Sequence, residues 1–264
     1  MALERIEVDG LQGLLTEVLR IANVQSTSSF LWYRGLDRKS YRLLPAIMRE
    51  GKSSAEVFDR ERRLLTRFRQ RSLPYWPAGY PQNDWEHLFA MQHHGVPTRL
   101  LDWTENLFVA THFALRSDIE GANDDHPVVW CIDPVQWNRA TPVLSEYGAS
   151  VQVLTTSDDD IEPYRPETSK RRNKSPVAIF GTHNSQRIVA QRGTFMIWGE
   201  DPRALEDFAD EMDTAKLWQI AIRGDRKQLA RDLASLGFGE TMVFPELASL
   251  ALELSRAEGW RAIP

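Results

Sequence analysis

Residues 91–115, which read MQHHGVPTRLLDWTENLFVATHFAL, constrain the fold of this chain more than any other stretch. Gly95 and Pro97 interrupt an incoming helix, because both residues disfavour a helix interior. A short buried strand follows at residues 98–103, and apolar residues at helical spacing predict a second helix from Asn106. Polar reactive residues and core residues are mixed densely here. We therefore expect the remaining chain to build a pocket around this loop and strand.

Strand and helix patterns follow one another irregularly along the 264 residues. Further strands are predicted at residues 127–132, 177–180, 194–198, 217–222 and 241–244. The steady alternation of a parallel α/β sheet is missing, so the pattern favours an α+β single domain. We expect a small split or mixed β-sheet core with flanking helices.

Three parts are expected along the chain. Residues 1–29 form an N-terminal helical extension, residues 30–250 the main domain, and residues 251–264 the end of a C-terminal helix and a tail. Within the main domain, residues 138–175 read as an irregular insertion with an acidic and a basic patch. Such a length is uncommon for a passive connection. A mobile surface flap, a lid facing a substrate and a disordered segment all fit it.

The composition excludes some classes of protein. The net charge of −5 argues against a protein that coats nucleic acid. Cys131 is the single cysteine, which excludes disulfides and a cysteine zinc site, and its apolar neighbours indicate a buried structural thiol. The charged N-terminus does not resemble a secretion signal, and no run is long and apolar enough to span a bilayer. We expect a cytoplasmic protein without a membrane partner.

An aromatic run at residues 30–33 ends in Arg34 and Gly35. A guanidinium at the end of a buried strand is suited to gripping a phosphate or a carboxylate with two hydrogen bonds. Gly35 would let the backbone approach a ligand closely. The alternative is that Arg34 extends past the strand to reach water.

Two clusters have other chemical interpretations. His93, His94 and Asp102 suggest a metal-dependent hydrolase, but adjacent residues on a helix point about 100° apart, which disfavours a shared metal. We predict no metal site. The helix predicted at residues 54–71 carries six arginines, interleaved with acidic residues, which is typical of a solvated face. These arginines and the basic residues 170–174 are the contacts expected if the protein is a noncatalytic module that binds a nucleotide or nucleic acid.

Several motifs together resemble the FRG domain family, which is named for its aromatic-Arg-Gly motif. The matching pieces are Tyr33-Arg34-Gly35, Leu44-Pro45 with Arg49, the run from Gln92 to Thr104, Ala110 with Phe113-Ala114, Arg187-x3-Gln191-x-Gly193-x-Phe195, and Phe244-Pro245. The resemblance extends over roughly residues 30–250. It implies a bacterial or phage protein and does not by itself imply a reaction.

The order of these motifs is similar to that of ADP-ribosyltransferases of the Arg–Ser/Thr–Glu type. The analogy implies that NAD is bound as substrate, with Arg34, Thr104 and Gln191 as the catalytic residues. It also implies a nucleotide site, whose expected residues are Tyr33, Gly35, His93, Thr98, Arg99, Asp102, Trp103 and Phe195. The implied activity is ADP-ribose transfer or NAD hydrolysis in a toxin, effector or phage-defence component. Whether a protein or a nucleic acid is the acceptor stays open.

Gln191 departs from that motif order, because a neutral amide supplies neither a base nor a counter-charge. Glu200 and Glu246 are the two candidates for the missing carboxylate. Purely structural roles also fit these residues: a buried Arg99–Asp102 pair, Thr104 as a helix cap, and Gln191 as a partner of backbone groups.

Overall fold

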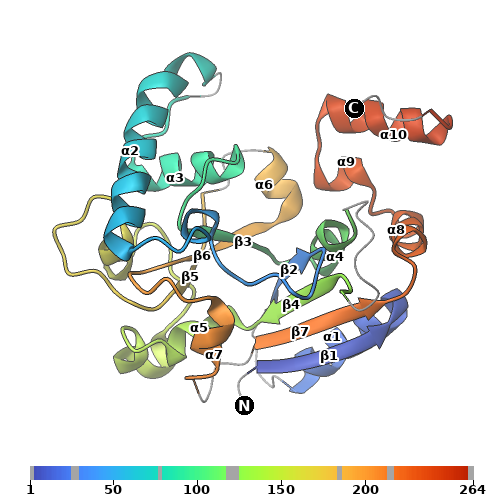
Figure 1. Ribbon diagram of the computed structural model, residues 1–264, viewed down its shortest axis with the longest axis horizontal. Helices are drawn as coiled ribbons and strands as arrows, with labels where there is room; N and C mark the ends of the chain where they lie inside the picture. Colours follow the sequence, from blue (N-terminus) through green and yellow to red (C-terminus); the bar gives the residue numbers. More distant parts are fainter. Residues whose placement is uncertain are drawn as a thin grey trace.

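One mixed sheet of seven strands organises the chain (Figure 1). The computed structural model describes residues 3–24, 30–76, 79–116, 125–182, 186–212 and 217–260. The strands are β1 (Leu3–Asp9), β2 (Trp32–Leu36), β3 (Leu100–Thr104), β4 (Val128–Ile132), β5 (Val177–Ile179), β6 (Gly193–Ile197) and β7 (Leu217–Arg223). Their order across the sheet is β1-β7-β4-β2-β3-β6-β5. Only β1 and β7 pair in parallel among these strands, so the α+β expectation is confirmed.

The sheet is narrowest between β2 and β3, where a single residue pair, Tyr33 with Thr104, joins the strands. The neighbouring pairs are longer, since β2 aligns five residues with β4 and β3 aligns five residues with β6. In the register set by Tyr33 and Thr104, Gly35 would face Asp102, but these two residues do not pair. The strands therefore separate from this pair toward Gly35 and Asp102 and leave space between them.

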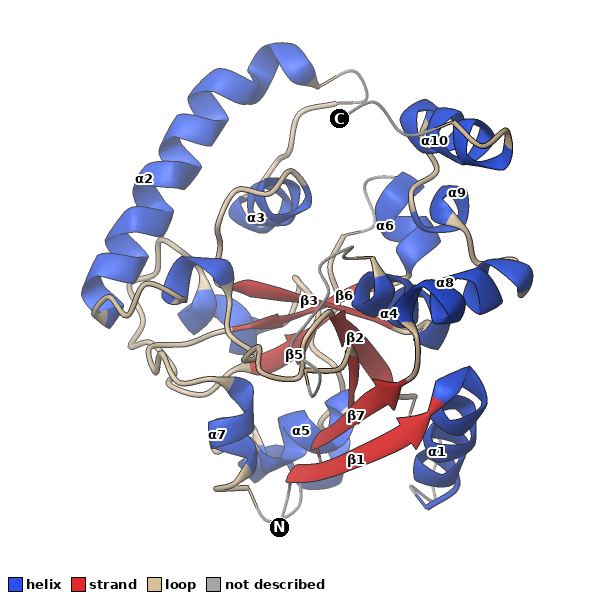
Figure 2. Ribbon diagram, turned by 45° about the vertical axis from the view of Figure 1, so that its right-hand side comes forward, coloured by secondary structure: helices blue, strands red, loops and turns tan. Residues whose placement is uncertain are grey.

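Helices cover both faces of the sheet (Figure 2). On one face α1 (Gly10–Val24), α4 (Leu107–Leu115) and α8 (Arg226–Ser235) pack on β1, β7, β4 and β2 around a cluster that includes Tyr33 and Ile220. Near the other face lie α5 (Pro134–Ala140) and α7 (Leu205–Ala209), and a second cluster there contains five tryptophans: Trp32, Trp103, Trp130, Trp137 and Trp198. The large indole side chains fill the space between this face of the sheet and the helices that cover it.

Five more helices complete the set in the described residues: α2 (Ser54–Ser72), α3 (Asp84–His93), α6 (Gln186–Gln191), α9 (Glu240–Val243) and α10 (Leu247–Ala257). Short 3-10 turns occupy Ala46–Met48, Leu73–Tyr75, Ser145–Ser150 and Asp159–Tyr164. Ser53 and Glu56 form a capping box at the start of α2. Both ribbon views show α2 and α10 on opposite sides of α3 and α6 (Figures 1 and 2).

The N-terminal segment is not only helical. β1 precedes α1 and forms one edge of the sheet. Only Leu3 is buried, and the residues after Arg5 alternate between partly buried and exposed, as expected for a strand with one face in water. The many charges between its apolar residues concealed this strand in the sequence. The expectation of a helical extension at residues 1–29 is therefore corrected to a strand followed by a helix within the described part.

The stretch at residues 138–175 differs from the mobile flap or disordered segment that its composition suggested. Leu144, Ile161 and Tyr164 are fully buried and pack with α3 and with strands β3, β5 and β6. The Tyr164 hydroxyl donates to the carbonyl of Ser175 at 2.8 Å. These apolar residues are separated by polar turns, so no periodic pattern revealed them. The segment is irregular, but it covers part of the core.

The structure also tests the strand predicted at residues 241–244 and the predicted burial of Cys131. Residues 240–243 form α9, so the strand expected at residues 241–244 is wrong, because packing of Val243 and Phe244 against α4 overrides β propensity. Cys131 is fully buried in β4, as expected, and burial raises the pKa of its thiol. None of the helices in the described ranges is sufficiently long and apolar to cross a bilayer.

Candidate functional site

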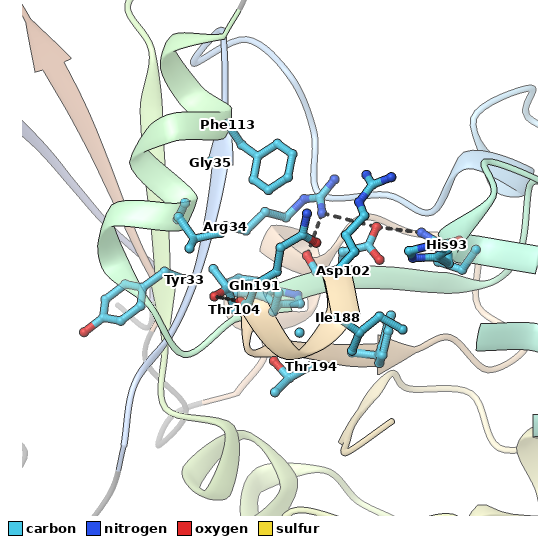
Figure 3. Close-up of a pocket in the computed structure, with 17 residues that line it drawn as sticks. Tyr33, Arg34, Gly35, His93, Asp102, Thr104, Phe113, Ile188, Gln191 and Thr194 are labelled. Carbon is cyan, nitrogen blue, oxygen red and sulfur yellow. Dashed lines mark hydrogen bonds and ion pairs between the residues drawn. The ribbon is translucent and has the colours of Figure 1, made fainter. Parts of the chain in front are cut away.

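A pocket of about 220 Å³ opens where β2 and β3 separate (Figure 3). Its walls come from elements that are far apart in the sequence. The lining residues are Tyr33, Arg34, Gly35, Gln92, His93, Asp102, Trp103, Thr104, Val109, Ala110, Phe113, Arg187, Ile188, Gln191, Gly193, Thr194 and Phe195. β2, the end of α3, β3, α4, α6 and β6 therefore contribute to one site. We call it the Arg34 pocket.

The Arg34 side chain lies in the space between the separated strands. Its Nη1 donates to the Asp102 carbonyl at 2.5 Å, and the same nitrogen lies 4.0 Å from Asp102 Oδ2. Its Nε is buried and has no hydrogen-bond partner among the described residues. Burial lowers the pKa of the guanidinium, whereas the Asp102 charge raises it. Arginine nevertheless stays protonated in proteins. The pocket therefore holds a positive charge with unused donor capacity.

Gly35 lines the pocket, but its closest neighbour is a helix. A Cβ on Gly35 would lie 1.8 Å from the carbonyl oxygen of Ala110 and 2.7 Å from the amide nitrogen of Ala114. Both atoms belong to the backbone of α4, which cannot yield as a flexible side chain would. The glycine thus allows α4 to pack directly on β2. The expectation that Gly35 also allows the close approach of a ligand stays a prediction.

A chain of hydrogen bonds orients Asp102. Gln92 Nε2 donates to Asp102 Oδ2 at 2.6 Å, and Thr98 Oγ1 donates to Gln92 Oε1 at 2.7 Å. Thr98 Oγ1 in turn accepts from the Leu100 amide at 3.1 Å. Thr98 is fully buried and does not line the pocket, although the sequence suggested that it binds nucleotide. Its contacts instead position the Gln92 and Asp102 side chains.

Thr104 and Gln191 meet at the pocket. Thr104 Oγ1 donates to the Gln191 carbonyl at 2.5 Å and accepts from the Asn106 amide at 3.0 Å. Gln191 Nε2 donates to the Val243 carbonyl at 3.1 Å. The Thr104 hydroxyl thus connects β3 to α6, and the Gln191 amide connects α6 to α9. Asn106, rather than Thr104, caps α4 by accepting from the Phe108 amide.

Arg187 adds a second positive charge to the pocket. Burial lowers its pKa, and the nearby charge of Glu246 opposes that shift. Its guanidinium lies 4.6 Å from the centre of the Phe244 ring. Burial and the charge of Arg187 lower the pKa of His93, and the charge of Glu246 partly opposes that shift. The Glu246 charge therefore opposes the lowering of the pKa at both residues.

The aromatic side chains expected at the site have other main contacts. Figure 3 shows the Tyr33 ring pointing away from Arg34, and that ring belongs to the cluster under α1 and α4. The Trp103 indole packs in the tryptophan-rich cluster, and the Phe195 ring stacks on Phe89 with centroids 4.9 Å apart. Phe113, which the sequence-based set omitted, lies beside the Arg34 side chain instead (Figure 3).

Arg99 is fully buried and does not line the pocket. Its Nε donates to Glu61 Oε2 at 2.8 Å, and its other donors bond the carbonyls of Tyr164 and Trp198. It also lies 4.3 Å from the centre of the Phe58 ring. The expectation that Arg99 contacts a nucleotide, and the alternative of an Arg99–Asp102 pair, are replaced by a buried pair with Glu61.

The predicted catalytic residues Arg34, Thr104 and Gln191 all line the Arg34 pocket, together with His93 and Asp102. Arg187 is the functional candidate that sequence reasoning missed. It stands in the motif with Gln191, one helical turn earlier, and that spacing was the available signal. Glu200 lies elsewhere, in a surface depression with Phe58 and Arg172. In the parts of the chain that the structure describes, no group of three or more His, Cys, Asp or Glu residues could hold a metal.

The sequence pattern of the FRG domain matches residues 29–123. The chain carries an FRG domain. The match covers β2, β3 and α4, and with them most of the walls of the Arg34 pocket. The FRG motif itself supplies Arg34, whose Nε has no partner among the described residues, and Gly35, which allows α4 to pack on β2. Comparison of the chain with curated proteins and with solved structures gave no significant match.

Proposed function

We propose that the Arg34 pocket binds NAD and that this FRG-domain protein transfers ADP-ribose to an acceptor or hydrolyses NAD. The observation that carries the proposal is the buried Arg34 guanidinium, which has one hydrogen bond and an unpartnered Nε. Buried polar groups in proteins are almost always satisfied, so an orphan of this kind suggests a missing ligand. An anion such as a pyrophosphate would supply the acceptor oxygens.

The arrangement of the walls supports the likeness to ADP-ribosyltransferases. Arg34 lies on the central strand β2, Thr104 is the last residue of the adjacent strand β3, and Gln191 ends α6 just before β6. The three side chains come from distant segments but share one pocket. The separation of β2 from β3 would provide the split sheet that this type of fold requires. Fold likeness alone would not carry a function, and it adds here to the chemistry of Arg34.

The size of the pocket suggests how NAD would lie. About 220 Å³ is below the range of roughly 300–1,000 Å³ usual for pockets that bury a drug-sized ligand. The pocket would therefore enclose one part of the dinucleotide, and the rest would extend along the surface. Arg34 and Arg187 would hold the phosphates, and Phe113 would pack on an aromatic ring.

The reaction breaks the bond between the ribose carbon and the nicotinamide nitrogen. Nicotinamide leaves as a neutral ring and keeps the bonding electrons. A hydroxyl or amine of the acceptor, or water, forms the new bond to the same carbon and loses a proton. Gln191 cannot accept that proton, because an amide is not a base at neutral pH. Glu246, which acts electrostatically on Arg187 and His93, is the carboxylate that we assign to this role.

The test measures NAD binding and nicotinamide release with purified protein. Arg34→Ala should weaken NAD binding on the order of 100-fold, since hydrogen bonds to a charged group are worth about 1.5–3 kcal/mol. Arg171→Ala, which removes an exposed arginine outside the pocket, should leave binding unchanged. Circular dichroism of both variants shows whether they fold alike.

Two outcomes would overturn the proposal. One is wild-type protein that neither releases nicotinamide nor gains thermal stability at millimolar NAD. The other is an Arg34→Ala variant that folds normally and binds NAD as the wild type does. Glu246→Gln should retain NAD binding and lose nicotinamide release, which separates binding from proton transfer.

A further inference from the structure

A second depression lies beside the C-terminal end of α2 and, like the Arg34 pocket, is lined in part by residues at the end of α3. It has a volume of about 510 Å³ and is lined by Leu64, Arg67, Phe68, Arg71, Ser72, Tyr75, Trp76, His94 and Val96. We call it the α2 groove. Its lining combines aromatic rings and arginines and contains no carboxylate. We propose that the α2 groove binds single-stranded nucleic acid, which would make nucleic acid the acceptor of ADP-ribose if the proposed function holds.

Two polar groups inside the groove lack partners. The Ser72 side chain belongs to a residue only 8% exposed, and its Oγ has no hydrogen-bond partner within the described residues. The same holds for the indole Nε1 of Trp76. An indole N–H can only donate, and a hydroxyl can donate or accept. A ligand in the groove should therefore offer hydrogen-bond acceptors next to a flat apolar surface, as nucleobases do.

The arginines of α2 fall into two sets. Arg60, Arg62 and Arg69 each pair with a nearby carboxylate, namely Glu50 at 2.7 Å, Asp59 at 2.8 Å, and Asp84. Arg63, Arg67 and Arg71 make no ion pair with any carboxylate that the structure describes. These three are spaced four residues apart, so they lie on one side of the helix. Two of them line the groove, where they are available to phosphates.

The aromatic residues provide stacking surfaces. Tyr75 is 79% exposed, so most of its ring is accessible to a ligand. Trp76 contacts Phe68 edge to face, with centroids 6.3 Å apart and planes at 82°. Because every base has a π-face, aromatic side chains beside cationic ones bind single strands with little sequence preference. The overall charge of −5 makes this local cluster the source of any attraction.

The groove adjoins the pocket that is proposed to hold NAD. His93 lines the Arg34 pocket and His94, the next residue, lines the α2 groove. Their rings contact each other at 4.8 Å between centroids. A strand whose base stacks on Trp76 or Tyr75 would thus have its neighbouring nucleotides close to the reacting ribose. An acidic peptide would satisfy Arg67 and Arg71, but it would leave the exposed ring faces without a flat partner.

The test titrates a fluorescent 12-nucleotide single strand, as DNA and as RNA, against the full chain without NAD and follows anisotropy. The Arg67→Ala/Arg71→Ala variant should weaken binding at least tenfold, and Tyr75→Ala several-fold. The matched control is Arg60→Ala/Arg62→Ala, which removes two paired arginines of the same helix and should change binding less than twofold. For two or three phosphate contacts, the logarithm of affinity should fall with the logarithm of salt with a slope of about −1.4 to −2.1.

Three results would overturn the inference: no binding by the wild type, equal losses in the two double-arginine variants, or preference for an acidic peptide over the oligonucleotide. Because NAD is absent from this titration, its outcome does not depend on the proposed activity. Labelled NAD is then added, and label on the oligonucleotide supports nucleic acid as acceptor. Oligonucleotide binding together with label only on added protein would overturn that assignment.

Discussion

Arg34 lies on β2 and Arg99 directly precedes β3, and the surroundings of these two arginines differ sharply. Arg99 is completely buried, pairs with Glu61 and bonds two carbonyls. The Arg34 side chain is 17% exposed, makes one hydrogen bond and has an unpartnered Nε. Both residues are cations, yet only Arg34 lines the Arg34 pocket.

The difference shows how donor satisfaction separates two roles of the same residue type. A guanidinium carries five N–H donors, and burying them without partners is costly. At Arg99, Glu61 on α2 and the carbonyls of Tyr164 and Trp198 supply the partners, so the cation holds these segments together. At Arg34 the protein leaves donors unused, so the missing partners are expected from a ligand.

Arg99→Met should have the largest effect on stability. It removes one member of a buried ion pair and leaves the Glu61 carboxylate without its counter-charge. Such a change typically costs about 3–5 kcal/mol. Urea unfolding followed by circular dichroism measures the loss. Arg62→Met, which breaks an exposed pair on the same helix as Glu61, is the control and should cost at most about 1 kcal/mol. Equal effects in both variants would contradict the structural role of Arg99.

Gly35→Ala should have the next largest effect, because the added methyl would overlap the backbone of α4. Overpacking of this kind costs about 1–3 kcal/mol and sometimes more. Gly193→Ala is the control, since its Cβ would meet nothing closer than Ile188 at 3.4 Å. Thermal unfolding measures the stability of both variants relative to the wild type. If Gly35→Ala were as stable as the wild type, the close contact of β2 and α4 would be wrong.

Titration of His112 should change the free energy of unfolding by less than the two substitutions above. Burial lowers the pKa of His112 on α4, and Arg116 and Arg256 lower it further, while Glu240 opposes them. The unfolded state therefore binds the proton first as the pH falls below about 6.5. The free energy of unfolding should then decrease between pH 7.5 and 5.5, by on the order of 1 kcal/mol. In His112→Gln this part of the pH dependence should vanish, and an unchanged profile would refute the assignment.

Arg34→Met should have the smallest effect on stability, within about 1 kcal/mol. It removes one hydrogen bond but also a buried charge that lacks full compensation, and these contributions offset each other. Urea unfolding beside Arg99→Met gives the direct contrast. A loss of 3 kcal/mol or more would mean that Arg34 is as structural as Arg99, and the proposal of a ligand-binding cation would lose its basis.

Much of the local structure was predictable because it depends on nearby residues. The helix at residues 54–71 was expected from its apolar stripe and is found as α2. The break at Gly95 and Pro97, the strand that follows and the helix after Asn106 are also confirmed, with bounds shifted by one or two residues. The segments that failed lack a simple period, as in residues 138–175, or are only one turn long, as in α9.

Residue types and their order were sufficient to predict the FRG motif, the α+β class and the main residues that line the pocket. Which of the two similar arginines lines a pocket depends instead on the tertiary packing. Glu61, the partner of Arg99, lies 38 residues earlier in the chain, and the space around Arg34 exists because β2 and β3 pair at one residue. Spacing along a chain does not specify such partners, since they depend on how distant segments pack. The burial and hydrogen bonding that follow then distinguish a cation whose donors are satisfied from one that has an unpartnered donor.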